Sequence, residues 1–228
     1  MAAATAVETL SPDGFVVPLQ NGLGNVETLV QELGETRVLP GLTFHSGDLV
    51  QPGQVTHTNQ GPTYLGELDG SQSERLLALR DVLVAADMNP VLESDIMATI
   101  WQKVVLNCAI NAICAITDLR PGHISEVPEL DEFQTRIVEE VLALARARGI
   151  ALPEPEPLGT IKEYCASKFH RVSMLQHLQR GRATEIDALN GYVARESQKL
   201  GLPAPCNDAL TRLMKGRHHR PDPSRNVG

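Results

Sequence analysis

The feature that most constrains this chain is a long apolar segment that carries a single polar row. Within residues Ser94–Thr117, the side chains of Lys103, Asn107 and Asn111 recur at every fourth position. At about 3.6 residues per turn, an α-helix places these three side chains on one face. Valine, leucine, isoleucine, cysteine and alanine fill most neighbouring rows, so the helix would carry an ammonium and two carboxamides beside packed hydrocarbon.

The polar row has two interpretations. A lysine can extend its ammonium to water, and asparagines can cap or bridge helices, so each residue taken alone is compatible with a structural role. Three polar side chains aligned over two turns instead favour the lining of a ligand site. Burial of an ammonium without a partner is costly and favours loss of its proton. Lys103 is therefore the strongest acid–base candidate in the sequence.

Composition excludes several classes of protein. The chain has 228 residues, of which 42% are hydrophobic and 21% charged, enough for the core of one large or two small domains. Its net charge of −8 argues against a nucleic-acid-binding surface. No grouping of histidines, cysteines or carboxylates has the spacing of a metal site, so we expect no metal. The basic run at 215–220 precedes a polar tail for which we expect no fixed structure.

The cysteines and the apolar runs indicate the compartment. Four cysteines are scattered along the chain without a CxxC pair, which fits a reducing environment. No run of about 18 apolar residues is present, and the first residues lack the charged and apolar regions of a signal peptide. We therefore expect a cytoplasmic protein without a membrane span.

The first part of the chain alternates short helices with strands, and the remainder is helical. In the first part, helices are predicted over 3–10, 25–33 and 71–86. Extended segments are predicted at 15–19, 37–46, 49–58, 62–68 and 89–92, the middle three as an antiparallel meander with turns at 46–48 and 59–61. Five helical segments are predicted from residue 94, with glycine and proline breaks at 121–122, 149–156, 181 and 201–205.

Three other positions carry polar groups whose roles the sequence leaves open. Asn21 follows the predicted strand at 15–19, where an amide can reach a ligand or shape a turn. Thr184 and Asp187 have capping-box spacing, which leaves Glu185 in a first helical turn, where the helix dipole favours a carboxylate. An exposed glutamate without a ligand is compatible with that position too. Ser173 lies at a helix break, where its hydroxyl could cap the helix or bind a carboxylate.

The glycines after the first predicted strand do not complete a dinucleotide-binding motif. Gly22 and Gly24 have the spacing of the first two glycines of GxGxxG, but Glu27 stands where the third is required. No downstream acidic residue is convincingly placed to bind a ribose. We therefore do not interpret this turn as a cradle for a pyrophosphate.

Three motifs together resemble those of the ketopantoate reductase (2-dehydropantoate 2-reductase) family. They are QNGLGN at 20–25, WQKVVLNCAINAICAI at 101–116, and SMLQ at 173–176 followed by TEID at 184–187 and NG at 190–191. The resemblance covers nearly the whole chain. It implies NADPH-dependent reduction of the ketone of a 2-oxo acid, ketopantoate to pantoate, in the biosynthesis of pantothenate and coenzyme A. It also implies a Rossmann domain followed by a helical domain similar to the C-terminal domain of 6-phosphogluconate dehydrogenase.

The resemblance assigns roles to the matching residues. Lys103 would donate a proton to the carbonyl oxygen while hydride arrives from the nicotinamide. Asn107, Asn111 and Ser173 would hold substrate oxygens. Asn21 would lie between cofactor and substrate, and Glu185 would contact the cofactor ribose or the substrate hydroxyl. Burial of Lys103 would lower its pKa towards the operating pH, while a nearby glutamate would raise it again.

Two departures from the family pattern qualify these expectations. Some relatives carry a further substrate-binding asparagine about ten residues after the second helical one, and residues 118–122 offer none. Family members also begin with a strand and a GxGxxG turn, which these 228 residues do not contain. We accordingly expect weak NADP(H) binding by these residues alone. The alternative function is a non-enzymatic substrate-binding or assembly module, and a homodimer is also open.

The expected fold class is an α/β fragment followed by an all-α domain. Residues 1–93 are expected to form a partial, truncated dinucleotide-binding domain, the remnant of a Rossmann domain with an antiparallel meander. Residues 94–215 are expected to form the helical substrate and catalytic domain. Residues 216–228 are expected to be a flexible tail.

Overall fold

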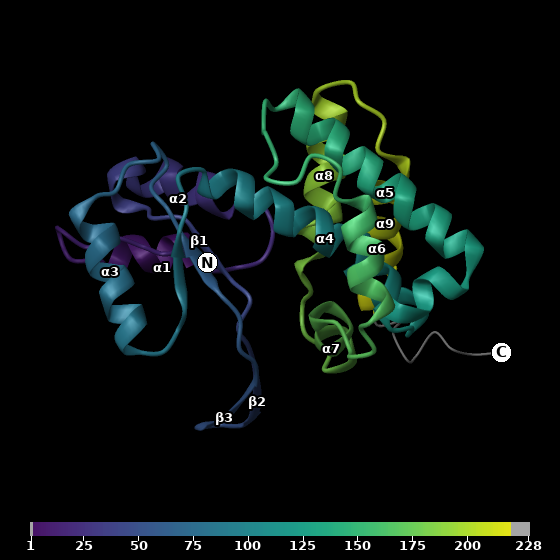
Figure 1. Ribbon diagram of the computed structural model, residues 1–228, viewed down its shortest axis with the longest axis horizontal. Helices are drawn as coiled ribbons and strands as arrows, with labels where there is room; N and C mark the ends of the chain where they lie inside the picture. The colour runs from purple at the N-terminus through teal and green to yellow at the C-terminus, as the bar shows by residue number, and fades with distance from the viewer. Residues whose placement is uncertain (1, 220–228) are drawn as a thin grey trace. The chain divides into compact units, whose positions relative to one another are not determined.

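The computed structural model describes the backbone of residues 2–219, and the side chains of all of these except residues 2–4 and 48 (Figure 1). The chain divides into two compact units, Met1–Ile100 and Trp101–Gly228. The division falls within the helix α4 (Ile96–Thr117). The presence of α4 confirms the long apolar helix that was predicted from periodicity. The fold is a small α/β region with an antiparallel sheet followed by a helical unit, which is the expected fold class.

A short mixed sheet forms the centre of the first unit. β1 (Gly41–Thr43) pairs antiparallel with β4 (Thr63–Leu65), which pairs parallel with β5 (Pro90–Leu92). The helices are α1 (Ala2–Thr9), α2 (Asn25–Leu33) and α3 (Glu74–Ala85), with a 3₁₀ turn η1 (Glu35–Arg37). All three helices predicted for this part of the chain are therefore confirmed. Fully buried leucines, one each from the segment before β1, from β4 and from α3, form the core: Leu39, Leu65 and Leu76.

A two-stranded ribbon is inserted between β1 and β4. β2 (Ser46–Gln51) and β3 (Gln54–Asn59) pair antiparallel and extend away from the sheet (Figure 1). This pairing differs from the predicted meander, because residues 49–58 fold back on themselves instead of pairing with 37–46 and 62–68. Residues 46–48 lie in β2 and not in a turn, whereas the predicted break at 59–61 is found, since β3 ends at Asn59 and β4 begins at Thr63. The chain reverses at Pro52 and Gly53, where Gly53 has a φ of 82°, a conformation that a tight turn needs and that glycine adopts without a steric penalty.

The segment at 15–19 differs from the buried strand that was predicted. Within the described residues it pairs only at one isolated parallel bridge, between Val16 and Val38. The N–H of Val16 donates to the carbonyl of Arg37 at 2.9 Å, and the N–H of Leu39 donates to the carbonyl of Val16 at 2.9 Å. Pro18 follows two residues later and has no N–H to continue the ladder.

A buried ion pair ties α3 to the rest of the first unit. The carboxylate of Glu67, 6% exposed, accepts hydrogen bonds from Nε of Arg75 at 2.7 Å and from its Nη2 at 2.5 Å. The same guanidinium donates to the backbone carbonyl of Thr36, and its Cζ lies 5.5 Å from the ring centre of Phe15. The hydrogen bonds from Arg75 lower the pKa of Glu67 despite the opposing effect of burial.

The second unit is helical along its described length. After α4 come η2 (Pro121–Glu126), α5 (Pro128–Ala147), α6 (Leu158–Ala166), α7 (Ser173–Gln179), η3 (Glu185–Ala188), α8 (Asn190–Lys199) and α9 (Pro205–His218). The predicted breaks all fall between α-helices or at the start of one. α9 continues through residues 216–218, which were expected in the tail, and residues 220–228 lie outside the described part of the chain.

The helix break expected at Ser173 is found, since α7 begins at that residue. Residues 167–172 separate α6 from α7 because this segment packs on η2: the N–H of Gly122 donates to the carbonyl of Lys168 at 2.8 Å. The ring of Phe169 covers Gly122 so closely that a Cβ there would lie 2.6 Å from it. A Cβ at position 122 would require that ring to shift, so this contact between distant segments holds residues 167–172 close to η2.

α4 is the core helix of the second unit. Among residues 2–219 it is the one helix long and apolar enough to cross a membrane, yet 67% of its most apolar window is buried inside the structure. The side chains of Cys108 and Cys114 on α4 are fully buried, and Cys165 of α6 is 2% exposed. The burial of α4 within the protein accounts for its apolar composition.

Replacement of Arg75 by alanine should lower the free energy of unfolding of the first unit by about 2–4 kcal/mol, because it leaves the buried Glu67 carboxylate without its cation. Urea denaturation followed by circular dichroism at pH 7 measures this change. Arg80→Ala on the same helix is the matched control, since the Arg80–Asp81 pair is exposed and should cost about 0.5 kcal/mol or less. Equal effects of the two substitutions would contradict the role given to the buried pair.

Candidate functional site

Two buried carboxamides fix the orientation of α4. Gln134 of α5 donates from Nε2 to the backbone carbonyl of Ala109 at 3.3 Å, and Asn190 of α8 donates from Nδ2 to the carbonyl of Cys108 at 3.2 Å. Gln134 is 1% exposed and Asn190 is fully buried. The ring of Trp101 also meets Tyr192 of α8 edge to face, with ring centres 6.3 Å apart. α4 is therefore held from two sides by side chains of α5 and α8.

The polar row of α4 lies on another side of the helix. At about 100° per residue, Asn107 points roughly 200° away from Ala109, which receives the amide of α5. Asn111 is buried at 8% exposure, and Lys103 and Asn107 are partly buried. The three side chains thus form one partly covered polar surface in an otherwise apolar helix, and an ammonium and two carboxamides are groups that donate hydrogen bonds to oxygen.

Burial changes the acid–base behaviour of Lys103. Loss of hydration lowers its pKa from the ordinary value of 10.5 to about 8. No carboxylate contributes to this shift, so the rise expected from a nearby glutamate is not found. A lysine that titrates near pH 8 can hold a proton at neutral pH and release it to an oxygen that becomes strongly basic during a reaction.

The segment from α7 to η3 brings a second set of polar groups together. Ser173 is the first residue of α7, and His177 lies one turn later on the same face. Gly181, with a φ of 65°, reverses the chain, and the N–H of Arg182 donates to the carbonyl of His177 at 2.9 Å. Glu185, the first residue of η3, then meets His177, with 3.2 Å between Oε2 and Nδ1.

His177 was not among the residues singled out from the sequence. Its spacing of four residues from Ser173 was the available signal, because it places both side chains on one helical face. Its contact with Glu185 depends on the turn at Gly181, which periodicity does not reveal. The side chains of His177 and Glu185 are 32% and 23% exposed, so both are partly shielded from solvent.

The capping box predicted at Thr184 and Asp187 is wrong. Thr184 precedes η3 but its side chain accepts no capping hydrogen bond, and its Oγ1 is buried without a hydrogen-bond partner. Asp187 instead pairs with Lys215, with 2.8 Å between Oδ1 and Nζ. The physical reason is that residues 185–188 form a separate 3₁₀ turn, so α8 starts only at Asn190.

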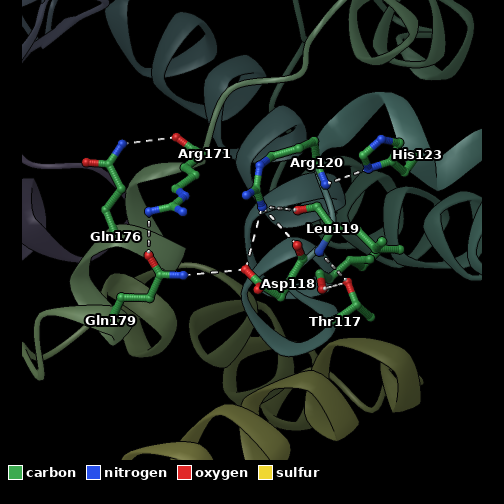
Figure 2. A network of polar contacts seen from close by, with 9 residues as sticks. Thr117, Asp118, Leu119, Arg120, His123, Arg171, Gln176 and Gln179 are labelled. Carbon is green, nitrogen blue, oxygen red and sulfur yellow. Dashed lines mark hydrogen bonds and ion pairs between the residues drawn. The ribbon is translucent and has the colours of Figure 1, made fainter.

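A polar network joins α7 to the segment that follows α4 (Figure 2). Nε2 of Gln179 donates to Oδ1 of Asp118 at 3.4 Å, and Nη1 of Arg171 donates to Oε1 of Gln179 at 3.3 Å. Arg120 donates to the backbone carbonyl of Asp118 at 2.8 Å. This is the segment where some relatives were expected to carry a further asparagine. Here its polar groups fasten α7 against the end of α4.

Asn21 belongs to the first unit, in the bend between Val16 and α2. Gly24 ends this bend as the residue before α2, with a φ of 90°, and its carbonyl accepts a hydrogen bond from the N–H of Thr28 at 3.1 Å. Asn21 is partly buried. The other candidates lie in the second unit, three on one face of α4 and two on the α7–η3 segment. Among residues 2–219, no group of three histidines, cysteines or carboxylates is placed to hold a metal ion.

Only part of a nicotinamide cofactor site is represented by these residues. The carboxylate of Glu185 and the carboxamide of Asn21 are partly exposed groups of the kind that bind ribose hydroxyls. The 228 residues contain no GxGxxG sequence to hold a pyrophosphate. Each of these two side chains, taken within its own unit, has the chemistry to bind a hydroxyl, and the turn at 21–24 lacks the third glycine of a pyrophosphate cradle.

Comparison with known proteins identifies relatives over almost the whole chain. The family model described as ketopantoate reductase PanE/ApbA C terminal matches residues 95–218, and the model described as ketopantoate reductase PanE/ApbA matches residues 1–70. A 2-dehydropantoate 2-reductase of Archaeoglobus fulgidus is 33% identical over 203 residues, which are 89% of this chain and 68% of that protein.

Solved structures give the same result. A PanE/ApbA family ketopantoate reductase from Ralstonia eutropha JMP134 is 29% identical with a TM-score of 0.86, over 95% of this chain and 71% of that one. A D-mandelate dehydrogenase in complex with NADH and anilino(oxo)acetate is 25% identical with a TM-score of 0.83, again over 95% and 71% of the two chains. Each match leaves part of the relative without a counterpart in these residues.

Lys103→Met should raise the stability of the helical unit by about 1–3 kcal/mol at pH 7, because it removes an ammonium that is costly to bury. Since the pKa of Lys103 is lowered to about 8, the cost of the charged form is present below that pH and disappears as the pH rises towards 10.5. The gain should therefore shrink by pH 10.

Urea denaturation at pH 7 and pH 10 measures this dependence. Lys199→Met is the matched control, because the Lys199 side chain is 69% exposed and its loss should change stability by about 0.5 kcal/mol or less. A destabilised Lys103→Met protein at pH 7 would contradict the argument.

Proposed function

Because the chain belongs to the ketopantoate reductase PanE/ApbA family, a family of nicotinamide-dependent 2-oxo acid reductases, we propose that it reduces ketopantoate to pantoate with NADPH, a step in pantothenate and coenzyme A biosynthesis. The observation that carries this proposal is the partly buried Lys103, whose pKa is lowered to about 8, at the start of a polar row on the core helix. Such a group is suited to proton donation at neutral pH.

Lys103 acts on the oxygen of the ketone. NADPH, when bound, supplies a hydride to the carbonyl carbon. As the carbon–oxygen double bond becomes a single bond, the oxygen gains negative charge, and Nζ of Lys103 stabilises it and transfers one proton to complete the hydroxyl. The amine is left neutral, a form that burial favours, and regains its proton from solvent before the next cycle.

The other candidates hold the substrate and the cofactor. The carboxamides of Asn107 and Asn111 and the hydroxyl of Ser173 donate hydrogen bonds to the oxygens of the 2-oxo acid. Asn21 and Glu185 contact the nicotinamide ribose or a substrate hydroxyl. In this assignment residues 1–93 are the part of the dinucleotide-binding domain that the chain contains, and residues 94–215 form the substrate and catalytic domain.

The choice of cofactor and substrate is tested by direct comparison. The D-mandelate dehydrogenase relative was solved with NADH, so turnover of the protein should be measured with NADPH and NADH, and with ketopantoate and phenylglyoxylate. The proposal expects the pair of NADPH and ketopantoate to have the highest kcat/KM. We further propose a cytoplasmic location, which the four free cysteines support, and a homodimer, which light scattering tests.

A second candidate function is a substrate-binding or assembly module without catalysis. The polar row of α4 would serve it equally well, because an ammonium and two carboxamides can bind the oxygens of a 2-oxo acid whether or not reduction follows. Calorimetric binding of ketopantoate without any oxidation of NADPH would support this candidate. Measurable turnover that depends on Lys103 would exclude it.

Lys103→Ala should lower kcat by about 10²–10⁴-fold, since it removes the proton donor, and should change KM much less. Lys162→Ala is the control, because Lys162 pairs with Asp131 at 2.7 Å and is given no part in the reaction. Steady-state kinetics at pH 7 provides the measurement. An unchanged kcat in Lys103→Ala would remove Lys103 from its proposed role.

The pH dependence of reduction should follow the proton on Lys103. With a pKa lowered to about 8 by burial, the lysine is charged at pH 7 and neutral well above pH 8. The kcat/KM for reduction, which reports the ligand-free protein, should thus be level below about pH 7 and fall by about tenfold per pH unit above about pH 8.5. A rate that stays constant to pH 10 would show that another group donates the proton.

A further inference from the structure

The contact between His177 and Glu185 is not used by the proton transfer described above. It joins residues eight positions apart in the sequence, and it exists because the chain turns back at Gly181 after α7. Nδ1 of His177 lies 3.2 Å from Oε2 of Glu185. With the two side chains 32% and 23% exposed, solvent only partly screens this contact, so it can favour one orientation of the carboxylate.

The backbone of Glu185 is already fixed by local structure. It is the first residue of η3, and its carbonyl accepts a hydrogen bond from the N–H of Leu189 at 3.1 Å. What remains free in a glutamate at such a position is rotation of the side chain, whose terminal torsion has a broad energy minimum. A donor on Oε2 restricts that rotation and sets the direction of Oε1.

Ser173 makes this placement relevant to a ligand. Ser173 and His177 share one face of α7, so the hydroxyl of the first and the carboxylate held by the second belong to the same polar surface. His177 is thus one helical turn from Ser173 and in contact with Glu185, two of the proposed ligand-binding residues, without having been assigned a role itself.

We propose that His177 is a positioning residue: its Nδ1–H donates to Oε2 of Glu185 and orients that carboxylate to bind a hydroxyl of the 2-oxo acid substrate or of the cofactor ribose. The inference rests on the proposed function, because it takes Glu185 as a ligand-binding group. It requires the tautomer of His177 that carries its proton on Nδ1, which the hydrogen bond to a carboxylate stabilises.

The tautomer of His177 is measured by ¹⁵N NMR of the imidazole ring at pH 8 in the absence of ligand. The wild-type protein should show His177 protonated on Nδ1, and Glu185→Ala should lose that preference. The signal is assigned by its disappearance in His177→Asn. A wild-type ring protonated on Nε2, with Nδ1 bare, would overturn the proposal.

Binding of ketopantoate, measured by isothermal titration calorimetry, tests the consequence of the contact. His177→Ala should weaken binding by about tenfold, the usual effect of losing a hydrogen bond to a charged group. His177→Asn should bind within about threefold of wild type, because the asparagine Nδ2 can donate from a position close to that of Nδ1. His170→Ala is the matched control on the preceding segment and should bind like wild type.

Where turnover is measured, His177→Ala should raise KM by about tenfold and lower kcat by less than about threefold, since Lys103 is untouched. Glu185→Ala should weaken binding at least as much as His177→Ala. The double substitution should be no worse than Glu185→Ala alone, because His177 acts through Glu185. Additive losses, or a wild-type affinity in His177→Ala, would overturn the proposal.

The outcomes separate this inference from the proposed function. If Glu185→Ala binds and reduces ketopantoate like wild type while Lys103→Ala is inactive, the role of His177 fails and the reductase assignment stands. If Lys103→Ala turns over normally, the proposed chemistry fails. In that case the NMR and calorimetric results still decide whether His177 orients Glu185 for binding.

Discussion

The structure of the helical unit depends on two side-chain amides that reach into the backbone of its central helix. Gln134 and Asn190 donate to the consecutive carbonyls of Ala109 and Cys108, from α5 and from α8. Loss of either contact would leave a buried amide group short of one hydrogen bond, at a cost of about 1–3 kcal/mol. A rotation of α4 by one residue, about 100°, would break both contacts at once. The side of α4 that carries Lys103 is therefore set by the core and not by the lysine.

This constraint explains how the protein can keep an unfavourable group in place. Lowering the pKa of Lys103 from 10.5 to about 8 means that burying its charged form opposes folding by a few kcal/mol, about 3 kcal/mol at most. An isolated helix would relieve that cost by turning the ammonium to water. The contacts of α4 with α5 and α8 prevent this rotation of the helix. The favourable free energy of those contacts therefore keeps Lys103 partly buried, with its pKa lowered towards neutral pH.

Prediction from the sequence was most accurate in segments where apolar residues recur with the helical period. The helix α4 was found to within two residues at its start, and α2 at both ends, because apolar residues recur there at helical spacing. The common face of Lys103, Asn107 and Asn111 follows from that helix alone, although their roles stay predictions. Local turn signals were less reliable: residues 46–48 lie inside the ribbon, whereas the break at 59–61 is found, and the ribbon itself reverses at Pro52 and Gly53.

The errors share a physical cause, which is contact between segments that are distant in sequence. The ring of Phe169 packs over Gly122, a contact that no local pattern indicates. Thr184 has the residue type of a cap, but the following turn is too short and too tight to use it. The contact between His177 and Glu185 was not predicted, because it depends on the chain reversal at Gly181. None of these contacts has a periodic signature, so a single sequence does not reveal them.

The buried sulfurs of the helical unit have a practical consequence. Burial raises the pKa of Cys114 to about 12 and raises that of Cys108 further, so neither thiol forms the reactive thiolate in the native state. Alkylating reagents can attack these sulfurs only after the helices around α4 separate. Because Cys206 is partly exposed, it is the modification of Cys108 and Cys114 in particular whose rate reports how often the interior opens.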